Sequence, residues 1–408
     1  MQSTQRSASA ALSAGASVVD ITPPLAVGLL TSSVKGEYEA FESVRLPLKA
    51  RVLVLRSPDE TVAVVSMDLL ALNDTSVGGW QEFKNGMSDE IPPEKIILTC
   101  THTHSAPESV ALSGLYLTKE YKTWLTEVQA GIKEGISQAL KAAKPCTVTF
   151  SSALLNGYSL QRRIPTAEGI VMSDSLQPVS DELMHRGPVD RRVRTVRLVG
   201  LTGDVVATLV HAICHPVHEM CLPHISSEFP GEMCLTLEAA ATHGVPIFLN
   251  GAAGDTNPPS VALGPLYARQ HGQALAGVAV RRNREVEAGT GVFKFVHREI
   301  QLSIREAAGV VNQRDALARF SALRIGALVI LFLPGEPFVE TAQAIEAASP
   351  FDYTIVVGFG ENNIGYIPTR TAFDQGGYEV GPGKWSFLEK GADEIIYSAA
   401  LKILEELQ

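Results

Sequence analysis

The sequence predicts an α/β fold built from mixed sheet layers with flanking helices. Short apolar runs of strand length recur along the chain, and stretches with apolar residues at helical spacing lie between them. This alternation is typical of layered α/β proteins. Several apolar runs also end abruptly in polar or glycine- and proline-containing motifs. Because open α/β folds bind their ligands at such strand ends, we expect the functional site there.

The apolar runs predict the strands in chain order. Runs rich in valine, isoleucine and leucine, bounded by turn residues, indicate buried strands. The predicted strands, each with the polar residue that ends or follows it, are 51–55 and 61–68 (Asp68), 96–104 (His104), 205–218 (His218), 245–255 (Asp255), 327–337 (Glu336) and 353–363 (Tyr366).

Apolar periodicity predicts helices over 120–143, 341–348 and 392–407. Two segments, 22–47 and 156–192, lack a regular pattern, and long ordered loops are usually functional. The chain has no internal repeat, low-complexity tract or evident linker. We therefore expect a flexible N-terminal segment at 1–15 and a single catalytic domain at 16–408.

Composition excludes some classes of partner. The 408 residues are 45% hydrophobic and 19% charged, and the net charge of −10 argues against a nucleic-acid surface. No apolar stretch is long enough for an integral membrane segment. The first residues lack the leucine-rich core of a secretory signal, which predicts a cytoplasmic protein, or a secreted or periplasmic one if a signal peptide has been removed. The oligomeric state stays open, including a homo-oligomer.

The five cysteines form no CxxC pair of the kind that builds a structural zinc site. Reduced thiols are the simplest interpretation. Cys100 and Cys214 lie beside histidine motifs and could be ligands, but their position inside apolar runs favours core packing.

Histidines gather at two of the predicted strand ends. In IILTCTHTHSAPE, His102 and His104 are two residues apart, so in extended backbone they would face the same side. The alternative is a pair of solvated loop histidines. A second segment, 211–224, holds four of the ten histidines of the chain, namely His211, His215, His218 and His224. His211 lies within an apolar run and is expected to be buried, whereas His215, at the strand end, is the better ligand.

These residue types predict a metal site at the ends of strands. Zinc prefers imidazole nitrogen with some carboxylate oxygen, and a catalytic zinc site keeps one position open. His102 and His215 supply two nitrogens, and Glu336 in LPGEP supplies an oxygen.

Six motifs resemble, in the same order, those of the neutral/alkaline ceramidase family. They are VVDITPP (18–24), THTHSAP (101–107), AICHPVH (212–218), GAAGDTNP (251–258), LPGE (333–336) and GYIPT (365–369). The resemblance implies a zinc amidase whose metal, Zn²⁺, is held by His102, His215, Glu336 and Tyr366. It further implies that His104 and Tyr378 contact the substrate. Arg162 resembles the family's arginine more loosely, because Gln161 precedes it and Arg163 is an adjacent competitor.

The sequence also departs from the family pattern. Asn257 occupies the place of a serine that has been proposed as nucleophile, so covalent catalysis there is excluded, although its amide could orient a substrate or an oxyanion. Ala106 and Glu108 replace glycines. Ceramidases also carry a C-terminal β-rich domain, which we do not expect within these 408 residues.

The sequence thus predicts a zinc-dependent hydrolase that cleaves an amide bond of a small-molecule or lipid-like substrate with a zinc-activated water. His104 or His218 would act as the base, and Glu228 and Glu232 could orient a ligand, although surface solvation is the expectation for Glu232. An esterase or lactonase for a smaller, sugar-derived substrate has the same metal chemistry. The alternative outside the enzymes is a non-catalytic zinc- or ligand-binding protein.

Overall fold

The computed structural model describes residues 12–176, 178–281 and 284–408. Its largest element is a mixed nine-stranded sheet of order β15-β13-β12-β8-β1-β5-β6-β7, with β17 paired to β8. The pairs β6/β7 and β13/β15 are parallel, and the other pairs are antiparallel. The strands are β1 (Ser13–Asp20), β5 (Lys49–Arg56), β6 (Thr61–Met67), β7 (Ile96–Cys100), β8 (Lys144–Leu154), β12 (Arg192–Gly200), β13 (Val205–Ala212), β15 (Val245–Asn250) and β17 (Val286–Glu287).

A four-stranded sheet of order β18-β19-β20-β22 packs against one face of the large sheet. Alternate residues of β5 show the two faces, because Leu53 and Leu55 pack toward this second sheet while Val52 and Val54 pack toward helices. The strands are β18 (Phe293–Gln301), β19 (Leu317–Ile325), β20 (Leu328–Phe332) and β22 (Tyr353–Val357).

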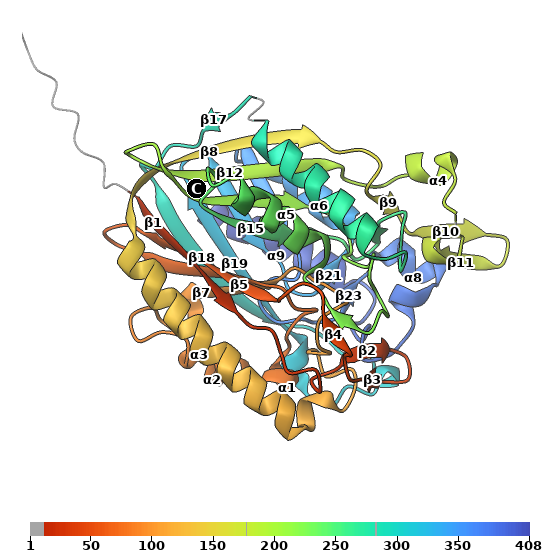
Figure 1. Cartoon of the computed structure of the whole chain (residues 1–408). Coiled ribbons are helices and arrows are strands. Elements are labelled where there is room, and N and C mark those ends of the chain that lie inside the picture. The colour runs from red at the N-terminus through yellow and green to blue at the C-terminus, as the bar shows by residue number, and fades with distance from the viewer. Residues whose placement is uncertain (1–11, 177, 282–283) are drawn as a thin grey trace, which may run out of the picture.

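Helices cover both outer faces of the two sheets, which gives four layers. The long helix α3 packs on β1 and β5, and the pair α5 and α6 packs beside β15 and β12 (Figure 1). On the other side, α7 and α9 cover the four-stranded sheet. The helices are α1 (Asp74–Val77), α2 (Trp80–Asn85), α3 (Lys119–Ala142), α4 (Asp181–His185), α5 (Glu228–Ala239), α6 (Pro265–Val280), α7 (Val339–Ala348), α8 (Arg370–Gln375) and α9 (Ala392–Glu406).

The segments predicted to be irregular contain short strands, some in local hairpins and some paired with strands far along the chain. Residues 22–47 and 156–192 supply β2, β3, β4, β9, β10 and β11, together with α4. The two-stranded pairs are β2 (Leu29–Ser32) with β3 (Glu37–Glu39), β4 (Ser43–Val44) with β14 (His224–Ile225), β9 (Leu160–Gln161) with β16 (Thr256–Asn257), β10 (Arg163–Thr166) with β11 (Gly169–Met172), and β21 (Glu336–Pro337) with β23 (Tyr366–Ile367).

The predicted fold class is confirmed, and each predicted strand and helix is present with shifted ends. The run 205–218 is strand only to Ala212, because His215 and His218 lie in the loop after β13. The predicted boundary at 15/16 is wrong, since β1 begins at Ser13 and pairs with β5 along its whole length. The rest of the predicted flexible segment, 1–11, lies outside the described residues. Among the helices that the structure describes, none combines the length and the apolar character needed to cross a bilayer.

Candidate metal centre

The two histidines of THTH converge, but not for the predicted reason. The strand β7 ends at Cys100, and His102 adopts a left-handed backbone with φ of 69°, so the extended-strand argument is wrong. The chain turns because the His102 N–H donates to Leu69 O and the His104 N–H donates to Pro216 O. The turn places His102 Nε2 3.3 Å from His104 Nε2.

Asn250 joins the two chain segments that carry His102 and His215. The strand β15 lies against β6 and β7, so the end of β13 comes close to the end of β7. At this point Asn250 Nδ2 donates to Thr101 O and to Cys214 O, both at 3.0 Å. Each acceptor precedes a histidine directly, and Asn250 thereby fixes the spacing of the pair. Nothing in the sequence pattern had singled out this residue.

Glu336 and Tyr366 are neighbours because β21 and β23 pair in parallel, with Glu336 opposite Tyr366. The carboxylate of Glu336 points at the histidines, and its Oε2 lies 3.5 Å from His102 Nε2 and 3.3 Å from His215 Nε2. This oxygen is buried and accepts no hydrogen bond within the described chain. A buried, unpaired carboxylate oxygen beside two imidazoles is costly unless a further group binds it.

The donor atoms fit a metal ion. His102 Nδ1 lies 2.7 Å from Leu70 O, and His215 Nδ1 lies 2.7 Å from Ala253 O. These carbonyls hold the hydrogen on Nδ1 and leave a lone pair on each Nε2, as in most metal-binding histidines. His104 Nε2 lies 3.3 Å from the first of these nitrogens, and Arg162 NH1 lies 3.3 Å from the second. The 3.3–3.5 Å spacing of the Nε2 and Oε2 atoms is also close to the roughly 3.3 Å edge of a zinc tetrahedron with 2.0–2.1 Å bonds.

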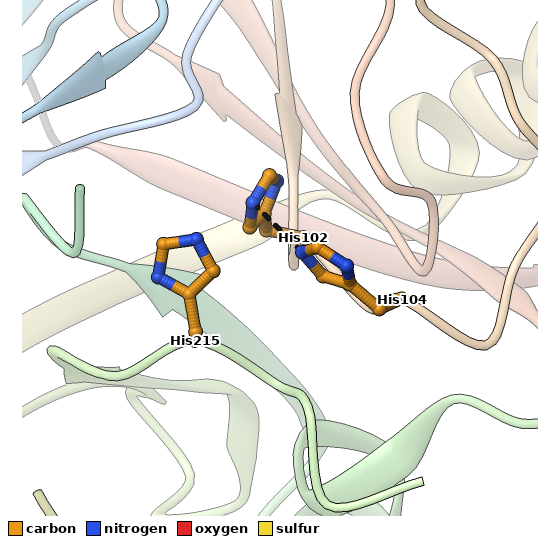
Figure 2. A group of neighbouring side chains, drawn as sticks. All are labelled: His102, His104 and His215. Carbon is orange, nitrogen blue, oxygen red and sulfur yellow. Dashed lines mark hydrogen bonds between the residues drawn. The ribbon is translucent and has the colours of Figure 1, made fainter. Parts of the chain in front are cut away.

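The nitrogens of His102, His104 and His215 all lie within 4.8 Å of one another, and the three rings converge in Figure 2. His104 differs from the other two, because within the described residues its ring contacts His102 and no backbone carbonyl. An imidazole without such a partner has a less fixed tautomer. The geometry therefore allows His104 either to complete the ligand set or to face the substrate.

The protonation states suit metal binding. Burial and the nearby Arg162 charge lower the pKa of His215 to about 4, which leaves the ring neutral at physiological pH. Burial opposes ionisation of Glu336, but the two imidazoles hold the pKa of this carboxyl well below its usual range. Neutral imidazoles and an ionised carboxylate are the forms that bind metal.

Arg162, rather than Arg163, lies beside the centre. Its NH1 is 3.3 Å from His215 Nε2 and 3.4 Å from Asn257 Oδ1, and its Cζ is 5.2 Å from the centre of the Tyr366 ring. Arg163 instead donates to Gly376 O at 2.7 Å, on the other side of Glu379. Glu379 receives a hydrogen bond from each arginine and thus holds Arg162 in place. This buried carboxylate had no sequence signal.

Tyr378 lies next to Tyr366 in the cavity wall, with ring centroids 5.8 Å apart. Its hydroxyl is 2.8 Å from Ser33 Oγ, and its ring stacks on Trp385 with a centroid distance of 5.5 Å. Burial raises the pKa of Tyr378 to about 12, so the phenol keeps its proton and can donate it. Ser33 comes from the segment 22–47, which therefore contributes to the site.

All the predicted site residues line one cavity of about 280 Å³. His102, His104, His215, Glu336, Tyr366, Arg162, Asn257 and Tyr378 all line it. Most of the remaining wall is apolar and is formed by Leu30, Leu70, Val110, Leu112, Met172, Val217, Met220, Val261 and Trp385. Glu108, at an altered family glycine, positions part of this wall, because its carboxylate accepts the backbone N–H groups of Val110, Leu112 and Ser113.

Three assignments from the histidine-rich segment are wrong. His218 points away from the cavity and contacts Ser260 and His271, so it cannot serve as the base there. Glu232 is buried and binds Arg45 instead of lying in solvent. Glu228 accepts backbone N–H groups from Glu219 and Phe229 and does not line the cavity. Cys100 and Cys214 are buried, as expected for core packing.

Glu228 is expected to make stability depend on pH. Burial, together with the charge of Glu219, raises the pKa of Glu228 from 4.5 to about 8. Because the folded-state pKa is the higher one, its contribution to stability is fully present below pH 4.5 and is lost as the pH rises through about 8. The free energy of unfolding should fall by roughly 3–5 kcal/mol across that window on this account alone.

Urea denaturation between pH 4.5 and 9 measures this effect when wild type is compared with Glu228→Gln. The variant should have a flatter pH dependence, whatever its absolute stability. Glu127→Gln, on the exposed face of α3, is the control and should keep the wild-type profile. An unchanged slope in Glu228→Gln would show that Glu228 is ionised in the folded protein.

The whole chain resembles two solved structures. The neutral ceramidase from Pseudomonas aeruginosa superposes with a TM-score of 0.75 at 18% identity, over 98% of this chain and 75% of that chain. A structure described as ceramidase complexed with C2 gives a TM-score of 0.77 at 16% identity, over 98% and 76%. No protein-family model matches the sequence, and no curated protein is significantly similar to it. The chain therefore has the ceramidase fold, which confirms the resemblance at the level of the fold.

Proposed function

We propose that this protein is a zinc-dependent hydrolase of the neutral ceramidase type that cleaves an amide bond. One observation carries the proposal: His102 Nε2, His215 Nε2 and the unpaired Glu336 Oε2 converge within 3.5 Å contacts at the wall of a cavity. Two imidazole nitrogens and a carboxylate oxygen are a common ligand set of catalytic zinc.

In this proposal, His102, His215, Glu336 and Tyr366 hold the ion. When bound, zinc polarises a substrate carbonyl and lowers the pKa of water toward neutrality, two roles that need no protein nucleophile. Burial and the neighbouring imidazoles keep the pKa of His104 well below its usual value, so its ring is neutral and can accept a proton.

Arg162 and Tyr378 supply the donors for the developing oxyanion. Arg162 stays charged, and its NH2 is buried with no hydrogen-bond partner in the described chain. Tyr378 keeps its hydroxyl proton. Donors fixed in advance on an apolar wall stabilise negative charge more strongly than water does.

Asn257 should contribute without forming a covalent intermediate. Its side chain lines the cavity and contacts Arg162, but an amide cannot be acylated as a serine can. We expect Asn257→Ala to slow hydrolysis by about tenfold, through looser placement of Arg162. Mass spectrometry of the enzyme during turnover should detect no acyl adduct in either form. An acyl group found on any side chain lining this cavity would contradict the mechanism.

Hydrolysis of smaller esters or lactones is the second candidate, and the size of the cavity favours it. The cavity volume of about 280 Å³ lies just below that of typical small-ligand sites, which span roughly 300–1,000 Å³. Two long hydrocarbon chains would have to extend beyond these walls. A short acyl group or a ring fits within them, and the metal chemistry is the same.

Turnover by the purified protein separates the candidates. The panel should contain a long-chain ceramide, short N-acyl amides, matched esters and sugar lactones, each with and without 1,10-phenanthroline. Chelator-sensitive turnover of an amide supports the first proposal, and turnover confined to esters or lactones supports the second. A metal-loaded protein that turns over no substrate would indicate a binding protein.

A further inference from the structure

A second group of reactive side chains lies behind the wall of the metal cavity. Val217 and Val261 line the metal cavity, whereas their neighbours His218 and Ser260 line a separate cavity of about 400 Å³. In each of these two chain segments, one residue therefore faces the metal cavity and its neighbour faces the second cavity. The mechanism proposed above uses nothing in this second cavity.

Ser260, His218 and His271 form a chain of hydrogen bonds. Ser260 Oγ lies 2.9 Å from His218 Nδ1, and His218 Nε2 lies 3.1 Å from His271 Nδ1. A nucleophile within hydrogen-bond reach of a base, which a third group orients, is the arrangement that activates a serine. The third group here is an imidazole in place of the more common carboxylate.

Both imidazoles are held rigidly. His271 lies in α6 and stacks on Phe229 at 4.0 Å and on Tyr158 at 4.8 Å between ring centres. His218 packs edge-on against Phe229 at 5.9 Å. Neither histidine is more than 2% exposed, and Ser260 is 6% exposed. Ser260 and His218 line the cavity, and His271 lies behind His218.

The hydrogen-bond directions suit a base. Burial lowers the pKa of His218 to about 4 and that of His271 well below its usual value, so both rings are neutral at physiological pH. A neutral ring has one N–H and one lone pair. If His218 Nε2–H donates to His271 Nδ1, His218 Nδ1 must accept from Ser260. The competing tautomer would donate from Nδ1 to Ser260 O, which lies farther away, at 3.3 Å.

We propose that Ser260 is a nucleophile in a second hydrolytic site, with His218 as its base and His271 as the residue that positions His218. The substrate class is small esters that fit a cavity walled by Tyr158, Leu263, Tyr267 and Gln270. Ser260 Oγ bonds to the carbonyl carbon while its proton moves to His218 Nδ1. The ester C–O bond then breaks, and the departing alcohol takes that proton. Water repeats the sequence and releases the acid.

Diisopropyl fluorophosphate tests this proposal on the intact protein. Ser260 Oγ should bond to phosphorus with loss of fluoride, and peptide mapping should find the adduct on Ser260. Labelling should continue after the metal is removed with a chelator, which separates this site from the metal centre. Ser260 left unmodified, or modified no faster than other serines, would overturn the proposal without affecting the metal site.

Variants define the roles of the two histidines. His218→Asn should slow labelling by about 10²-fold, the low end of general-base effects. His271→Phe keeps the aromatic stack but removes the acceptor and should also slow labelling, whereas His271→Gln should restore part of the rate because its amide oxygen can accept. Ser159→Ala, at a buried serine outside the triad, is the control and should label fully. Equal labelling rates in all these variants would contradict the proposed base.

Discussion

His102→Ala combined with His215→Ala should abolish both metal binding and hydrolysis. The two Nε2 atoms and Glu336 Oε2 are the atoms that converge at the cavity wall, so the double variant leaves one of the three. Lewis-acid activation contributes several kcal/mol to such reactions, and the rate should fall by about 10³-fold or more. Elemental analysis of protein purified without added metal should change from about one zinc per chain to none.

His185→Ala is the matched control for this double variant. His185 is exposed on α4 and its ring contacts only the backbone oxygen of Asp181 among the described residues. Metal content and rate should stay at the wild-type level. Circular dichroism should show that the double variant still folds, because both imidazoles line a cavity. Unchanged zinc in the double variant would show that the ion is bound elsewhere.

His104→Ala and Tyr378→Phe should each lose about 10²–10³ in kcat while retaining zinc. Removing a general base, as in His104→Ala, or one donor to a developing oxyanion, as in Tyr378→Phe, typically has an effect of this size. Both side chains line the cavity. In the wild-type protein His104 contacts His102, and the Tyr378 hydroxyl contacts Ser33. Because such interactions act mainly on the transition state, KM should change less than kcat.

The metal content of His104→Ala decides between the two roles that the geometry allows. Retained zinc with a slow rate assigns His104 to the substrate. Lost zinc would make His104 a ligand and reverse the roles within THTH. Trp385→Phe tests the ring packing of Tyr378 separately from its hydroxyl, because it keeps an aromatic stack but removes the indole N–H that donates to Tyr378 O. Full activity in both His104→Ala and Tyr378→Phe would show that the site is wrong.

The strands and helices could be predicted because their signal is local. The buried runs 52–55 and 96–98 are continuous apolar sequence, and α3 repeats its apolar residues at the helical period. Polar residues at strand ends likewise directed attention to His102, His215 and Glu336. These features need only the neighbouring residues for their interpretation.

Residues that act across the fold could not be predicted. Asn250 contacts Thr101 from 149 positions away, and Glu379 holds Arg162 from 217 positions away. Neither residue stands in a local pattern. The density of histidines around 211–224 wrongly suggested that His218 belongs to the metal cavity. Val217 lines that cavity, but the next residue, His218, faces the second cavity.

Anomalous diffraction at the zinc absorption edge tests the central claim most directly. Crystals should be grown from protein purified without added metal. The account predicts one strong peak within bonding distance of His102 Nε2, His215 Nε2 and Glu336 Oε2. A difference map without such a peak, or a peak bound by other residues, would contradict the assignment of this cavity as a zinc-dependent hydrolytic site.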